Sequence, residues 1–188
     1  MAVTVANLVA GPGTLYTGTF GATEPAASAV GSVPASATWS DLGGTLDGSM
    51  LKINQEYFEL EVDQVVDVVG RRLQKREISI ETQLAEPTLL NLSYALNGGT
   101  IVASSGWSSY DPDDASSVTQ PTYRAFILDG YAPSASTAKT RRTVLRRGLI
   151  TAEVELAYKK DEQTVIPVEI FAHYVSSATK PFQIVDAT

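Results

Sequence analysis

The stretch WSDLGGTLDGSMLKINQEYFELEVDQVVDVVGRRLQKREISIETQLAEPTLLNLSYALNGG, residues 39–99, contains the patterns that decide the fold of this chain. Residues 56–62 alternate between acidic and apolar side chains, and residues 76–84 repeat the alternation. A period of two residues is typical of a β-strand with one face in a core. Because Gly70-Arg71-Arg72 interrupts the pattern, we predict a long antiparallel hairpin over 56–84 with its turn at these residues.

The two faces of this predicted hairpin differ in chemistry. The apolar face, expected to point into the core, consists of Phe58, Leu60, Val62, Ile78, Ile80 and Leu84. The opposite face is acidic and consists of Glu59, Glu61, Glu77 and Glu81. Like charges on neighbouring strands destabilise a sheet. The acidic face therefore either meets bulk water or has a function that needs its charge.

A short helix is predicted next, over residues 87–97. Proline suits its first position, and Gly98-Gly99 suits its end. Leu89, Leu92 and Leu96 share one stripe at helical spacing, so we expect this helix to cover the sheet.

The remaining segments are predicted to be strands, a loop and an arm. Residues 1–38 are rich in small and turn-forming residues, with one short strand expected at Thr14–Phe20. This segment is either a flexible terminus or an arm that orders against a neighbouring subunit. Residues 104–121 are expected to form a long loop, where exposed Trp107 and Tyr110 favour a partner. Further strands are predicted at 122–128, 143–157, 165–175 and 182–185. The predicted fold class is mainly β: a single β-sandwich or barrel domain over 39–188, with one short flanking α-helix, a long loop and the terminal arm.

Composition restricts the class of protein. The 188 residues suit one domain with a substantial core, and no apolar run approaches the length of a membrane span. The absence of cysteine excludes disulfides and thiolate metal sites, in agreement with folding in a reducing cytoplasm. The N-terminal residues lack the basic leader of a secretory signal. A net charge of −7 argues against a protein that grips nucleic acid through phosphates.

Motifs for catalysis or ligand binding are not evident, so we expect no enzyme activity, cofactor or metal. His173 is the one histidine, and no nucleophile elbow or phosphate-binding loop accompanies it. Asp111, Asp113 and Asp114 lack the glycine and terminal glutamate of a calcium loop. The hairpin glutamates could supply a glycosidase pair, but they lie in a regular alternation rather than around a pocket.

Nine of the fourteen cations fall into two clusters, which consist of Arg71, Arg72, Lys75 and Arg76, and of Lys139, Arg141, Arg142, Arg146 and Arg147. A nucleic-acid patch is one interpretation, although interleaved aromatic residues are missing. We favour self-complementarity, in which arginines of one copy meet carboxylates of the next. The candidate inter-subunit residues are Trp107, Tyr110, Asp111, Asp113, Asp114, Arg141, Arg142, Arg146 and Arg147.

The order of these features resembles the tail tube proteins of long-tailed, siphovirus-like bacteriophages. The shared pattern is a tryptophan, a Leu-Gly-Gly-Thr loop, a strand hairpin and a Thr-Leu-rich helix, and the resemblance covers about residues 35–185. It implies a β-sandwich with one flanking helix that assembles into hexameric rings. The inner strands of a ring would join into one barrel, and the rings would stack through loops and arms into the conduit for viral DNA during ejection.

The resemblance also implies partners and a location. The partners would be further copies of the chain, tape-measure and tail terminator or tip proteins, and DNA that passes without specific binding. The protein would lie in the virion tail after assembly in the host bacterial cytoplasm, without contact with a membrane. Two other classes stay open: a receptor- or carbohydrate-binding β-sandwich, and a head–tail joining or capsid-decorating protein.

The tube hypothesis gives the acidic strand faces a function. A negative wall repels phosphates at close range, where salt screens least. Residues 149–158 also alternate, and they add two glutamates to the candidates. We therefore predict that the lumen is lined by some of Glu59, Glu61, Glu77, Glu81, Glu153 and Glu155.

Overall fold

The computed structural model describes residues 3–114, 116, 118–133 and 139–187. Its strands are β1 (Thr14–Thr19), β2 (Trp39–Asp41), β3 (Thr45–Val62), β4 (Val65–Leu84), β5 (Thr100–Ser104), β6 (Trp107–Asp111), β7 (Arg124–Ala132), β8 (Lys139–Ile150), β9 (Ile166–Ala172) and β10 (Phe182–Asp186). The helical elements among these residues are α1 (Leu89–Ala95) and the short 3₁₀ turns η1 (Val5–Asn7) and η2 (Ala27–Ala29).

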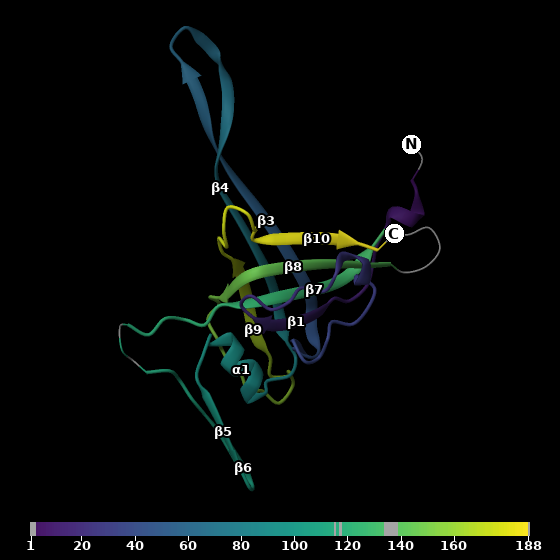
Figure 1. Ribbon diagram of the computed structural model, residues 1–188, viewed down its shortest axis with the longest axis vertical. Helices are drawn as coiled ribbons and strands as arrows, with labels where there is room; N and C mark the ends of the chain where they lie inside the picture. The colour runs from purple at the N-terminus through teal and green to yellow at the C-terminus, as the bar shows by residue number, and fades with distance from the viewer. Residues whose placement is uncertain (1–2, 115, 117, 134–138, 188) are drawn as a thin grey trace.

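One antiparallel sheet forms the body, in the order β2-β1-β7-β8-β9-β4-β3, and β10 pairs with β8. Strands β1, β7, β8 and β10 run across β3, β4 and β9, so the sheet folds over onto itself (Figure 1). Leu15 of β1 and Ile80 of β4 consequently belong to one buried cluster, and both are fully buried. The prediction of a mainly β fold with one flanking helix is confirmed.

The Trp39–Thr45 motif ties the start of β3 to the start of the helix. Gly43 has a φ of +83°, which L side chains rarely adopt, and the turn brings Leu42 into the core. Gly44 N donates to Glu86 Oε1 at 3.0 Å, and Asn91 Nδ2 donates to Leu42 O at 3.0 Å. The motif is therefore structural.

Helix α1 covers the edge of the core, through a face that only partly coincides with the predicted leucine stripe. Thr88 caps its N-terminus, since the hydroxyl accepts from Asn91 N at 3.1 Å. Its buried side chains include Tyr94 and Ala95, whereas Leu96 is 46% exposed. Leu92 of the predicted stripe packs against the core, so the leucine spacing is right for the helix and for part of its inner face, and wrong for Leu96.

The long hairpin differs most from the prediction. Its turn lies between Val62 and Val65, so the hairpin spans residues 45–84 and Gly70-Arg71-Arg72 lies inside β4. Ile78, Ile80 and Leu84 are buried as predicted. Strand β9 pairs only with residues 79–84 of β4, and beyond them the hairpin projects out of the body (Figure 1).

The apolar residues of the projecting half are consequently not in the core. Phe58, Leu60 and Val62 are 58%, 46% and 45% exposed. The prediction that they point into the core is wrong because the strands continue past the layer that would cover them.

A β-bulge in β4 changes which carboxylates share a face. Glu56 pairs with Lys75 and Tyr57 with Leu73, so Gln74 is an extra residue that reverses the alternation of β4. Glu77 lies opposite Asn54, whereas Glu59 lies opposite Arg71. Because residues 54 and 59 of β3 point to opposite faces, Glu59 and Glu77 do not share the single acidic face that was predicted.

Three other segments differ from their predictions. The short strand predicted at Thr14–Phe20 is present as β1, but it pairs with β2 and β7 inside the sheet rather than lying in an arm. An arm stays a prediction for the mostly exposed residues 3–13. The predicted loop at 104–121 begins as the β5–β6 hairpin; residues 115 and 117 of that loop lie outside the described residues. Strand β8 ends at Ile150, so Glu153 and Glu155 are exposed side chains of a segment that is not a strand, although Val154 and Leu156 between and after them pack against the core.

Replacing Gly43 by alanine tests the motif. We expect a loss of about 1–3 kcal/mol in the free energy of unfolding, because alanine must hold a positive φ. The Cβ would also collide with the Glu86 carboxylate that holds Gly44. Urea unfolding measures the loss. Gly31→Ala is the matched control, since a Cβ there meets nothing within 4 Å; equal stabilities of the two variants would contradict this account.

Candidate self-assembly surfaces

Arg142 is a structural residue of the subunit. Its side chain is 2% exposed, and its Nε and Nη2 donate to the two Asp129 carboxylate oxygens at 2.7 and 2.5 Å. Nη2 also donates to Ser32 O at 2.7 Å, and Nη1 to Ala29 O at 3.3 Å. Arg142 thus attaches the segment between β1 and β2 to the sheet inside its own subunit.

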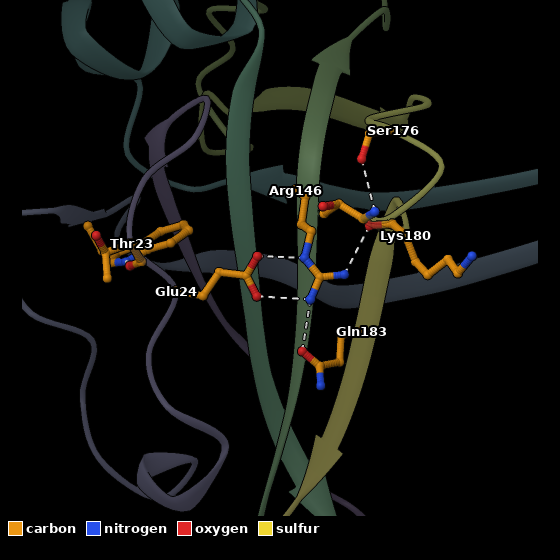
Figure 2. A network of polar contacts seen from close by, with 8 residues as sticks. Thr23, Glu24, Arg146, Ser176, Lys180 and Gln183 are labelled. Carbon is orange, nitrogen blue, oxygen red and sulfur yellow. Dashed lines mark hydrogen bonds and ion pairs between the residues drawn. The ribbon is translucent and has the colours of Figure 1, made fainter.

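Arg146 attaches the same segment at a second point (Figure 2). Its Nε and Nη2 donate to the Glu24 carboxylate at 2.5 and 2.9 Å. Nη1 donates to Lys180 O, and Nη2 donates also to Gln183 Oε1, both at 2.9 Å. One guanidinium therefore joins residues before β2, before β10 and within β10.

The attached segment covers a second hydrophobic cluster, on the face of β1, β7 and β8 that points away from the main core. This cluster consists of Tyr16, Trp39, Ala125, Ile127 and Val144. Trp39 Nε1 also donates to Thr23 O at 3.1 Å. The segment between β1 and β2 is thus held by two arginines and by a buried tryptophan.

Arg141 is neutralised at the surface. Its Nε and Nη2 donate to the two carboxylate oxygens of Asp186 at 2.6 and 2.7 Å. The hydrogen bond from Arg141 lowers the pKa of Asp186 below its usual range. Of the four arginines expected to meet carboxylates of another copy, three meet carboxylates of their own chain.

Arg147 is different, because it pairs with no carboxylate of the described chain. Its guanidinium lies 4.0 Å from the centre of the Tyr123 ring and donates to Tyr174 O at 3.1 Å. Arg124 is similar, 4.3 Å over the Tyr94 ring. Sequence reasoning missed both stackings, because tyrosines distant in sequence provide them.

The predicted lumen carboxylates are partly neutralised. Glu59 accepts from Arg71 at 2.7 Å, Glu77 pairs with Lys75 at 2.5 Å, and Glu81 pairs with Lys52. Each of these pairs is more than one-third exposed, so each contributes little to stability. Among the described residues, Glu61 has no ionic partner, and Glu153 is exposed.

The β5–β6 hairpin carries the remaining candidates. Trp107 is 57% exposed, whereas Tyr110 donates its hydroxyl to Gly98 O at 3.1 Å, and burial raises the Tyr110 pKa. Asp111, Asp113 and Asp114 are exposed. Within the described part of the chain no cluster of His, Asp and Glu suited to a metal ion occurs.

A depression of about 540 Å³ lies at the base of β3. Its walls include Asp47, Met50, Glu81 and Glu169. No aromatic residue lines it, which does not fit a sugar-binding surface built on aromatic rings.

The protein is thus a mainly β subunit, and its projecting β3–β4 hairpin exposes apolar side chains that another molecule could cover. A family model described as phage tail tube protein matches residues 3–187. The chain therefore belongs to the phage tail tube protein family and is a structural component of a phage tail. No curated protein matches it. No helix in the described ranges is long and apolar enough to cross a membrane.

Arg142 and Arg141 form a matched pair for a stability test. Arg142→Ala should lower the free energy of unfolding by about 3–5 kcal/mol, because Asp129 then keeps a largely buried charge without its partner. Arg141→Ala should cost at most about 1 kcal/mol, since that pair is solvent-exposed. Chemical denaturation of the monomer measures both. Similar losses in the two variants would show that Arg142 does not attach the segment as described.

Proposed function

We propose that copies of this chain assemble into hexameric rings that stack into a tail tube, the conduit for viral DNA during ejection. Family membership supports the structural role in the tail, and the ring, the stack and the passage of DNA are the proposal. Tape-measure and tail terminator or tip proteins as partners, and assembly in the host cytoplasm, are part of the same proposal.

The projecting half of the β3–β4 hairpin is the observation that carries the proposal. It exposes apolar side chains on both strands, with Phe58 at 58%, Val69 at 59% and Val66 fully exposed. The outer edge of β3 also has no strand beside it in the described sheet. Exposed apolar surface and an open strand edge are features that association with another chain removes. An isolated two-stranded ribbon is also only marginally stable in water, so a partner would stabilise it.

The bulge in β4 narrows the set of carboxylates proposed to face the lumen. Lys75, Glu77 and Glu81 of β4 point to one face because they are an even number of residues apart. Glu56 of β3 pairs with Lys75, and Glu169 of β9 pairs with Glu81, so these two glutamates lie on the same face. Lys52 and Lys75 lie among the four carboxylates, so the face is acidic on balance. We propose that this face forms the channel wall, while Glu59 and Glu61 lie on the other face of the hairpin.

Electron microscopy of the purified chain tests the assembly. We expect tubes or stacked rings with a central hole. Phe58→Ser combined with Val66→Ser should prevent them, because the exposed apolar surface then gains little from burial. Val33→Ser, at a position 79% exposed outside the hairpin, is the control and should assemble normally. A wild-type chain that stays monomeric at high concentration would contradict the proposal.

Lysine substitution tests the channel wall. Phage particles built with Glu77→Lys and Glu81→Lys should assemble tubes but eject DNA more slowly, because phosphates then bind the wall and release counterions. The corresponding glutamine variants remove the charge without reversing it and should slow ejection less. Ejection rates measured in vitro at several salt concentrations distinguish the wild-type, lysine and glutamine particles. Equal rates in all particles would place these residues away from the DNA.

A further inference from the structure

Aromatic side chains surround Arg147 at the point where β8 meets β9. We define the Arg147 patch as Phe20, Tyr123, Arg147, His173 and Tyr174. The Arg147 guanidinium lies 4.0 Å from the centre of the Tyr123 ring and 5.7 Å from that of Phe20. The His173 ring meets Tyr123 edge-on at 5.3 Å, and His173 N donates to Arg147 O at 2.8 Å.

No carboxylate of the described residues compensates the charge of the Arg147 patch. The Nε atom of Arg147 is buried and has no hydrogen-bond partner. Among the described residues, its guanidinium donates to one acceptor, the backbone carbonyl of Tyr174. Arg141, Arg142 and Arg146, in the same strand, each have a carboxylate. A partly buried guanidinium without an anion is costly, so a carboxylate from outside would be stabilising.

Exposed apolar surface flanks this cation. Phe20 is 50% exposed and Tyr174 is 68% exposed. Phe20 also lines a neighbouring cavity of about 250 Å³, together with Val144 and Val175. The Arg147 patch therefore fits a segment that combines carboxylates with small apolar side chains.

The tip of the β3–β4 hairpin, residues 61–67, has this composition. Its acidic residues Glu61, Asp63 and Asp67 form no ion pair with any described cation of their own chain. Val62 and Val65 are about half exposed, and Val66 is fully exposed. The tip projects far out of the body, whereas Arg147 lies in β8 within the body (Figure 1), so another copy must bring the two together.

We propose that the Arg147 patch of one copy binds the hairpin tip of a second copy, with tip carboxylates on the guanidinium and tip valines against Phe20 and Tyr174. The inference rests on the proposed tube function and names one of its contacts. Because tip and patch are different surfaces, the contact is head-to-tail and leaves a free tip and a free patch on each assembled pair. Such a contact continues from copy to copy.

The net charge of −7 favours the hairpin tip of a second copy over nucleic-acid phosphates as the occupant of the Arg147 patch.

A charge exchange tests the contact. The tip variant replaces Glu61, Asp63 and Asp67 by lysine, and the patch variant is Arg147→Glu. Each alone should raise the critical concentration for assembly at least about tenfold, since like charges then meet at a desolvated contact. The combined variant should recover most of the loss. Sedimentation and electron microscopy measure assembly, and circular dichroism verifies that each monomer is folded.

The control is Asp161→Lys, an exposed charge reversal away from the hairpin, which should assemble like the wild type. If the wild type forms tubes and the tip variant assembles at an unchanged critical concentration, the contact is wrong while the tube function stands. If Arg147→Glu assembles normally but loses affinity for duplex DNA, the Arg147 patch is a nucleic-acid site and the inference is overturned. A wild type that forms neither rings nor tubes overturns both proposals.

Discussion

Strand β4 is 20 residues long but pairs with β9 only from Ser79 to Leu84, and much of the structure depends on this mismatch. Within the paired part, Ile80 and Leu84 are fully buried and help to build the core. Beyond it, the same hairpin has no covering layer, so its apolar side chains meet water. A subunit that keeps such a ribbon loses hydrophobic stabilisation in isolation, and this loss is recovered only if another molecule covers the ribbon.

The body that carries this ribbon is held together by charges used within the chain. Arg142 and Arg146 attach the segment between β1 and β2, and they connect it to residues more than 100 positions away. Arginine suits this work because its planar group donates several hydrogen bonds in fixed directions. Among the described residues, the charges that this leaves without an ion pair include Arg147 in the body and the carboxylates at the hairpin tip.

The local patterns of the sequence predicted the element types well. The alternation from Ile78 to Leu84 and the capped leucine-rich segment correspond to β4 and α1. The turn of the long hairpin was a local failure, since it lies between Val62 and Val65 rather than at Gly70-Arg71-Arg72. The other main failures concern long-range features of the fold. Alternation does not show where the neighbouring strand ends, so Phe58 was assigned to the core. The extra residue Gln74 has no distinctive chemistry, so the change of face went undetected. Residues 151–157 alternate in exposure without a strand partner, so periodicity alone predicted a strand that is absent.

The partners of the arginines show the same limit for the candidate sites. Glu24 lies 122 residues from Arg146, and no spacing rule links them. The clustering of these arginines in the sequence indicates that they form ion pairs. Whether the carboxylate partner belongs to the same subunit or to another one depends on the folded structure. Among the residues that the structure describes, Arg124 and Arg147 each have a buried Nε without a hydrogen-bond partner, and the hairpin tip carries exposed valines and carboxylates without an ion pair. In an assembling subunit, the groups that the fold leaves unsatisfied are the ones with free energy to gain from a neighbour.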